Sequence, residues 1–93
     1  MKHNGVLHIV ANNDGSYMVK WSPAGGGGWQ PHRTLLDDAH LEQFLGGVLG
    51  IDQEQVTQAL KALREAPPGQ KRYVIPEVWL SAEEARQHGV APG

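Results

Sequence analysis

The serine and histidine side chains that could support nucleophilic or acid–base catalysis are scattered along the chain. The serines Ser16, Ser22 and Ser81 stand in contexts typical of a turn, the residue before a proline and a helix cap. The five histidines are spread over the N-terminus, a strand, a loop and two helices. Acyl transfer needs a nucleophile, a base and a group that orients the base. Because no segment combines these roles, we expect a non-catalytic protein that holds no cofactor.

Two groups of acidic and histidine residues have types that can ligate a metal ion. Asp37, Asp38 and His40 are close in sequence, and Glu84 and His88 lie one helical turn apart. A metal site needs more convergent ligands than either group offers. The chain has no cysteine, which excludes a thiolate zinc site. We interpret the first group as a helix cap and the second as a solvated helix face, and we expect no metal.

A glycine-rich segment, residues 22–33, contains four consecutive glycines. Such loops can cradle phosphate groups, but this one lacks the Gly-Lys-Ser/Thr ending of a P-loop. The composition predicts a flexible loop, since consecutive glycines cost much conformational entropy to order. Trp29 lies within it. A large aromatic side chain there is either pinned to the core or is an anchor for a binding partner.

The elements that position these residues follow from hydrophobic periodicity. Residues 6–21 contain two stretches typical of β-strands, separated by a turn sequence at 12–15. This pattern predicts a β-hairpin with Asp14-Gly15 in a type I′ turn. Residues 41–49 and 52–65 each carry an apolar stripe at helical spacing. Asp37 or Asp38 begins the first of these helices.

The boundaries of the second helix have local signals of their own. Asp52 and Gln55 have the spacing of a capping box, and Gly50 stands where a left-handed residue ends the preceding helix. Gly46 falls on the side where the two helices should cross, so we expect close helix packing there.

Residues 72–80 predict a further strand that is apolar on both faces. Tyr73 and Trp79 alternate with Val78, and Pro76 lacks a donor for the ladder, which indicates an edge strand or a bulge. An apolar edge strand is a site for pairing with another chain. We therefore expect a homodimer with Tyr73, Val78 and Trp79 at the interface. A short helix follows, with a capping box from Ser81 to Glu84.

The segment 41–66 resembles the helix-turn-helix of winged-helix transcription regulators. The residues that carry the resemblance are Gly46 before the turn, Gly50 and Ile51 in it, and Val56 and Leu63 on the second helix. The resemblance covers under a third of the chain. It implies DNA binding, with the second helix in the major groove.

The polar residues of the second helix are candidate DNA contacts, namely Gln53, Thr57, Gln58, Lys61 and Arg64. They are equally ordinary residues for a solvated helix face. Residues 52–65 sum to a charge of −1, and the chain carries −2 with a pI near 6.2. DNA binding draws on phosphate neutralisation by Lys and Arg, so the charge disfavours a nucleic-acid partner.

We predict a single α+β domain over residues 1–93, in the order β-β-α-α-β-α. The N-terminal hairpin and strand 72–80 form a small antiparallel sheet, covered by the helical hairpin. No apolar run is long enough to span a membrane, and the N-terminal residues lack the apolar length of a secretory signal, so we expect a cytoplasmic protein. The leading hypothesis is a non-catalytic protein-interaction module that self-associates and has an unidentified protein partner. The alternative is a helix-turn-helix DNA-binding regulator. A third hypothesis is an enzyme or small-ligand binder that uses the glycine loop.

Overall fold

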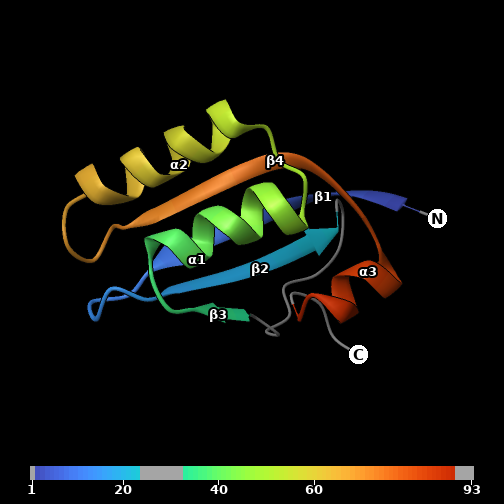
Figure 1. Cartoon of the computed structure of the whole chain (residues 1–93), viewed down its shortest axis with the longest axis horizontal. Helices are drawn as coiled ribbons and strands as arrows, with labels where there is room; N and C mark the ends of the chain where they lie inside the picture. The colour runs from blue at the N-terminus through green and yellow to red at the C-terminus, as the bar shows by residue number, and fades with distance from the viewer. Residues whose placement is uncertain (1, 24–32, 90–93) are drawn as a thin grey trace.

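Four antiparallel strands form one sheet, and the helices pack against it (Figure 1). The computed structural model describes residues 2–23 and 33–89. The strands are β1 (Lys2–Ala11), β2 (Tyr17–Pro23), β3 (Arg33–Leu35) and β4 (Arg72–Ser81), in the spatial order β3-β2-β1-β4. The helical segments are α1 (Asp38–Glu42), the π-helix η1 (Gln43–Val48), α2 (Gln53–Glu65) and α3 (Ala82–Gln87). The predicted α+β class is confirmed, with one more strand than expected.

The additional strand is β3, at the end of the segment predicted to be a glycine-rich loop. Its register places Leu35 opposite Tyr17 and Thr34 opposite Met18. Leu35 is fully buried, so this three-residue strand is fixed by its contact with the core rather than by any local periodicity. Trp29 and the glycine run lie outside the described residues.

The predicted hairpin of β1 and β2 is confirmed, but its turn differs from the expected type I′. Only Gly15, with φ of 89°, has a positive φ there, and the Gly15 amide donates to the Asn12 carbonyl at 3.2 Å. Asp14 instead accepts from Ser16, at 2.9 Å from the backbone nitrogen and 2.6 Å from the hydroxyl. The side-chain acceptor therefore organises a five-residue loop in which one left-handed glycine is sufficient.

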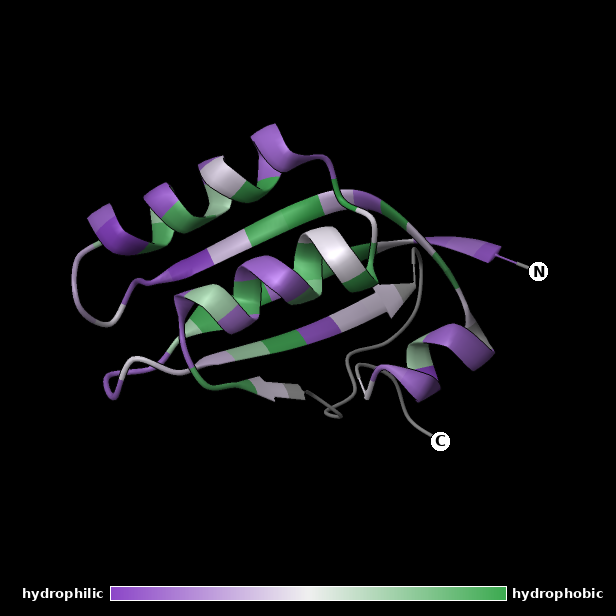
Figure 2. Ribbon diagram, viewed as in Figure 1, coloured by the Kyte–Doolittle hydropathy of each residue, from purple (hydrophilic) through white to green (hydrophobic). Residues whose placement is uncertain are grey.

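The helical hairpin covers one face of the sheet. Figure 1 shows α1 and η1 running along the sheet and α2 returning beside them in the opposite direction. The hydrophilic residues of α2 face away from the sheet in Figure 2, as its apolar stripe requires. The stripe is buried against the strands, and its residues are Val56, Ala59, Leu60 and Leu63. Burial of this face supplies the main stabilisation of the layer arrangement.

The first helix of the hairpin is irregular, which the apolar pattern did not predict. Beyond Glu42 it widens into η1, where the Leu49 amide donates to the Phe44 carbonyl at 3.0 Å, five residues back. Leu41, Phe44 and Leu45 are buried as expected, whereas Val48 is 46% exposed. The wider turn rotates Val48 off the apolar stripe.

The helix ends follow the predicted signals in three of four cases. Asp37 caps α1 by accepting from the His40 amide at 2.8 Å, and Ser81 and Glu84 form the complete capping box of α3. Gly50 has the predicted left-handed conformation, with φ of 70°. The prediction of a capping box for α2 is wrong, because Asp52 stands at the N-cap position but makes no side-chain capping hydrogen bond.

Trp21 joins three strands at the centre of the sheet. Its indole nitrogen, Nε1, donates to the Val78 carbonyl at 2.8 Å, so a side chain from β2 reaches across β1 to β4. Gly5 on β1 makes the crossing possible. A Cβ there would lie 2.5 Å from Trp21 Nε1 and 2.6 Å from the Ser22 carbonyl oxygen. Trp21 is 3% exposed, so its hydrogen bond is shielded from water.

A polar network joins the sheet to both long helices. The Tyr17 hydroxyl on β2 donates to Asp38 of α1, and Arg64 of α2 donates to the other oxygen of the same carboxylate through Nε at 3.0 Å and Nη2 at 2.6 Å. Burial and the Asp38 carboxylate raise the pKa of Tyr17 to about 12. The hydroxyl of Tyr17 and the guanidinium of Arg64 lower the pKa of Asp38.

Replacement of Gly5 by alanine should destabilise the fold by about 1–3 kcal/mol, because the added methyl group forces the Trp21 ring or the Ser22 carbonyl to move. Urea denaturation measures the loss. Gly47→Ala is the matched control, since a Cβ there meets nothing closer than 3.7 Å. Equal stabilities of the two variants would show that Trp21 does not require the glycine.

The Tyr17–Asp38–Arg64 network should make stability depend on pH at both ends of the range. The lowered pKa of Asp38 means that its contribution is present above the ordinary carboxyl pKa and is lost as pH falls through the lowered value. The raised pKa of Tyr17 means that its contribution is present below the ordinary tyrosine pKa and is lost as pH rises through about 12. Asp38→Asn should therefore reduce the stability lost between neutral and acidic pH, measured by urea unfolding.

Tyr17→Phe should reduce the stability lost in alkaline solution, in the same measurement. Tyr73→Phe, at a half-buried tyrosine outside this network, is the control for the removal of a phenolic hydroxyl. A Tyr17→Phe profile that overlays the wild type at alkaline pH would contradict the assignment.

Candidate functional site

The face of the sheet opposite the helical hairpin is not covered by any described element (Figure 1). Residues directly opposite each other on neighbouring strands point to the same side, so the register identifies this face. It carries Asn4, Val6, His8 and Val10 of β1, Met18, Lys20 and Ser22 of β2, Thr34 of β3, and Arg72, Val74 and Trp79 of β4. All of these are half-buried or exposed. We call this surface the open face.

Two neighbouring rows of side chains cross the open face perpendicular to the strands. One row is Thr34, Met18, Val10 and Arg72, and the next is Lys20, His8 and Val74. Together we call them the basic rows, because they contain two cations and no acid. A groove of about 350 Å³ lies here, lined in part by His8, Lys20 and Arg72. Partial burial and the Lys20 ammonium lower the pKa of His8.

Strand β4 forms one edge of the sheet, as Pro76 predicted. The strand also has a bulge, the other feature that a proline permits. Between the pairs Gly5–Val78 and Leu7–Ile75, one residue of β1 lies opposite two residues of β4, Pro76 and Glu77. Within the bulge Glu77 has a φ of 60°, in the region that favours glycine. The extra residue reverses the alternation of side chains along the strand.

The three residues predicted at a dimer interface are separated by this bulge. Trp79 is 56% exposed on the open face. Val78 is buried in the core, and Tyr73 is half-buried and packs against the core. Val74, which the sequence analysis did not select, is 49% exposed on the open face. Only the pairing with β1 reveals which side chains of this apolar strand point outward.

The five candidate DNA contacts are all exposed on α2, namely Gln53, Thr57, Gln58, Lys61 and Arg64. Several of them already have partners within the chain. Arg64 is paired with Asp38, and Gln53 donates to Glu42 at 3.4 Å. Thr57 donates to the Gln53 carbonyl at 3.0 Å. The pairing of Arg64 leaves Lys61 as the cation of this set without a described ion pair.

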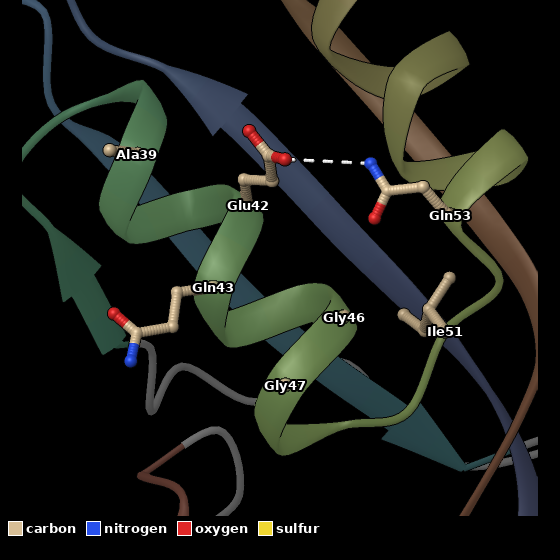
Figure 3. Close-up of a pocket in the computed structure, with 7 residues that line it drawn as sticks. All are labelled: Ala39, Glu42, Gln43, Gly46, Gly47, Ile51 and Gln53. Atoms are coloured by element: carbon tan, nitrogen blue, oxygen red, sulfur yellow. Dashed lines mark hydrogen bonds between the residues drawn. The ribbon is translucent and has the colours of Figure 1, made fainter.

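A shallow groove of about 530 Å³ lies between η1 and the start of α2 (Figure 3). Gly46 and Gly47 line it from η1, and Gln53 and Glu42 are hydrogen-bonded at its rim in Figure 3. The expectation of a tight helix crossing at Gly46 is wrong. A Cβ on Gly46 would meet only Gln53 Oε1, at 3.8 Å. The groove is therefore open where the crossing was predicted.

Several of the residues considered for catalysis and metal binding have structural roles in the described chain. Ser16 closes the hairpin turn, and Ser81 caps α3. Asp37 caps α1, and the His40 ring accepts from the Leu36 amide at 3.3 Å. Among residues 2–23 and 33–89, no group of three histidine or acidic side chains is arranged to hold a metal ion. None of the described helices is long and apolar enough to cross a membrane.

Alanine at Gly46 should stabilise the protein by about 0.5–1 kcal/mol, because it restricts the unfolded chain and meets only the end of a flexible side chain. Thermal unfolding compares it with Gly50→Ala, whose left-handed backbone makes the same change destabilising. A destabilised Gly46→Ala protein would restore the idea of a close helix crossing.

Comparison with known proteins identifies no relative. No protein-family model, curated protein sequence or solved structure matches the chain.

Proposed function

We propose that this protein is a non-catalytic interaction module that self-associates through the free edge of β4. The observation that carries the proposal is the exposure of an apolar side chain, Val74, on the first half of a strand with no described strand beyond it. An edge strand presents unpaired backbone donors and acceptors to another chain. Apolar side chains beside such an edge lose their contact with water when a second copy pairs there.

The geometry of β4 limits the pairing to its first half. Pro76 cannot donate, and the bulge at Glu77 twists the edge away from a regular ladder. An antiparallel pairing centred on Tyr73 sets Arg72 opposite Val74 of the second copy and leaves Pro76 outside the paired segment. Arginines of the two copies are then not directly opposed, which avoids the cost of like charges facing each other.

The alternative function is a helix-turn-helix regulator that reads DNA with α2. The exposure of Gln53, Gln58 and Lys61 supports it. The engagement of Arg64 by Asp38 and the acidic balance of residues 52–65 weigh against it. The antiparallel course of α2 beside α1 and η1 keeps its outer side exposed whichever function applies.

Sedimentation equilibrium should show a dimer of the wild-type protein at micromolar concentration. Val74→Lys should shift the equilibrium to the monomer, because a charge on an edge strand opposes pairing. Val48→Lys is the matched control, since Val48 has similar exposure, 46% against 49%, and lies on η1. It should remain dimeric.

Two results would contradict the proposal. A wild-type protein that stays monomeric at the highest soluble concentration removes self-association altogether. Dissociation by Val48→Lys but not by Val74→Lys moves the interface to the helical side. Thermal unfolding of both variants confirms that they are folded.

A further inference from the structure

The charges of the protein are distributed unevenly between its two layers. Strands β1, β2 and β4 contain three Lys or Arg residues and one acid, Glu77. The segment from Asp38 to Glu65, which forms the helical layer, contains five acids and two cations. The net charge of −2 is therefore the sum of opposite contributions, from a cationic sheet and from an acidic helical layer packed on it. An anionic partner is attracted to the open face and repelled by the helices.

The side chains on the open face suit an extended chain with both charged and planar groups. Lys20 and Arg72 lie in adjacent basic rows, about 7 Å apart along the strands. Trp79 lies on the same face beyond the bulge, roughly 20 Å from Arg72 along β4. The His8 ring lies between Lys20 and Val74. Cations for phosphates and exposed rings for stacking are the two components of single-strand binding surfaces.

A peptide is a poorer match for this surface. The backbone groups of the inner strands β1 and β2 are already paired in the sheet ladders. A peptide lying across the face would find side chains but no backbone partners, which are available only at a sheet edge. Nucleotides need no such ladder, because their phosphates take hydrogen bonds from side chains and their bases stack.

We propose that the open face binds single-stranded nucleic acid, with Lys20 and Arg72 on phosphates and Trp79 stacking on a base. The inference does not depend on self-association, because pairing at the β4 edge would leave the open face of each copy exposed. It also places nucleic acid on the side of the protein opposite the outer surface of α2. Two phosphate contacts give moderate affinity with a shallow salt dependence.

Fluorescence anisotropy of labelled single-stranded DNA and RNA of about 12 nucleotides tests the proposal, since this length is within the usual site sizes. Lys20→Glu should weaken binding at least about tenfold at low salt. Lys61→Glu makes the same charge change on α2 and should alter affinity by less than about twofold. Trp79→Ala should weaken binding roughly tenfold by loss of stacking, and Trp79→Phe should restore most of it.

Salt dependence and competition complete the test. Raising monovalent salt from about 50 to 200 mM should weaken binding about sevenfold if two phosphates are contacted. Duplex DNA and polyglutamate should compete poorly. If thermal denaturation shows that the Lys20→Glu variant is not folded, Arg72→Gln replaces it in the test, since Arg72 is exposed.

Three outcomes would overturn the inference. They are no binding of either single strand at low salt, equal competition by polyglutamate, and loss of binding with Lys61→Glu while Lys20→Glu binds normally. The last would favour α2 as the nucleic-acid surface. Sedimentation of the same samples measures self-association separately. A monomeric protein that binds the oligonucleotide would therefore contradict the dimer proposal and leave the nucleic-acid proposal intact.

Discussion

The contact that the sheet depends on most is the passage of Trp21 over Gly5 to the Val78 carbonyl. It links the second, first and fourth strands in space through one buried side chain. The hydrogen bond falls at the residue that follows the bulge, so it also fixes where β4 resumes its pairing with β1. Since that pairing decides which side chains reach the open face, the interaction surface depends on a contact made within the core.

Much of the fold was predictable because its signals are local. The hairpin turn at 12–15, the caps at Asp37 and Ser81, and the stop at Gly50 each depend on residues a few positions apart. The features that were missed depend on contacts between distant residues. Strand β3 exists because Leu35 is buried, and Asp52 makes no cap although its spacing to Gln55 is suitable. The π-helix also could not be predicted, because the apolar residues of this segment have the spacing of a regular α-helix.

The candidate site was predictable in part. Proline at position 76 correctly indicated an edge strand, and Trp79 is exposed. Val78 was expected at an interface but is buried in the core, because the sequence of a strand that is apolar on both faces does not indicate which face is buried. The basic rows could not be predicted at all. Lys20 and Arg72 are far apart in sequence, and only the shared pairing of β2 and β4 with β1 places them on one surface.

The bulge at Glu77 divides β4 into two parts, in which opposite sets of positions point toward the helices. Before it, Tyr73 and Ile75 point toward the helices, and after it Val78 and Leu80 do, so inward positions change from odd to even numbers. A regular pairing of the same residues, without the bulge, would keep one alternation along the whole strand and would turn the Trp79 indole into the core and Val78 and Leu80 toward solvent. The register of the strand at this point therefore matters as much as its composition. A shift of one residue separates a tryptophan available to partners from a tryptophan that the protein would have to bury.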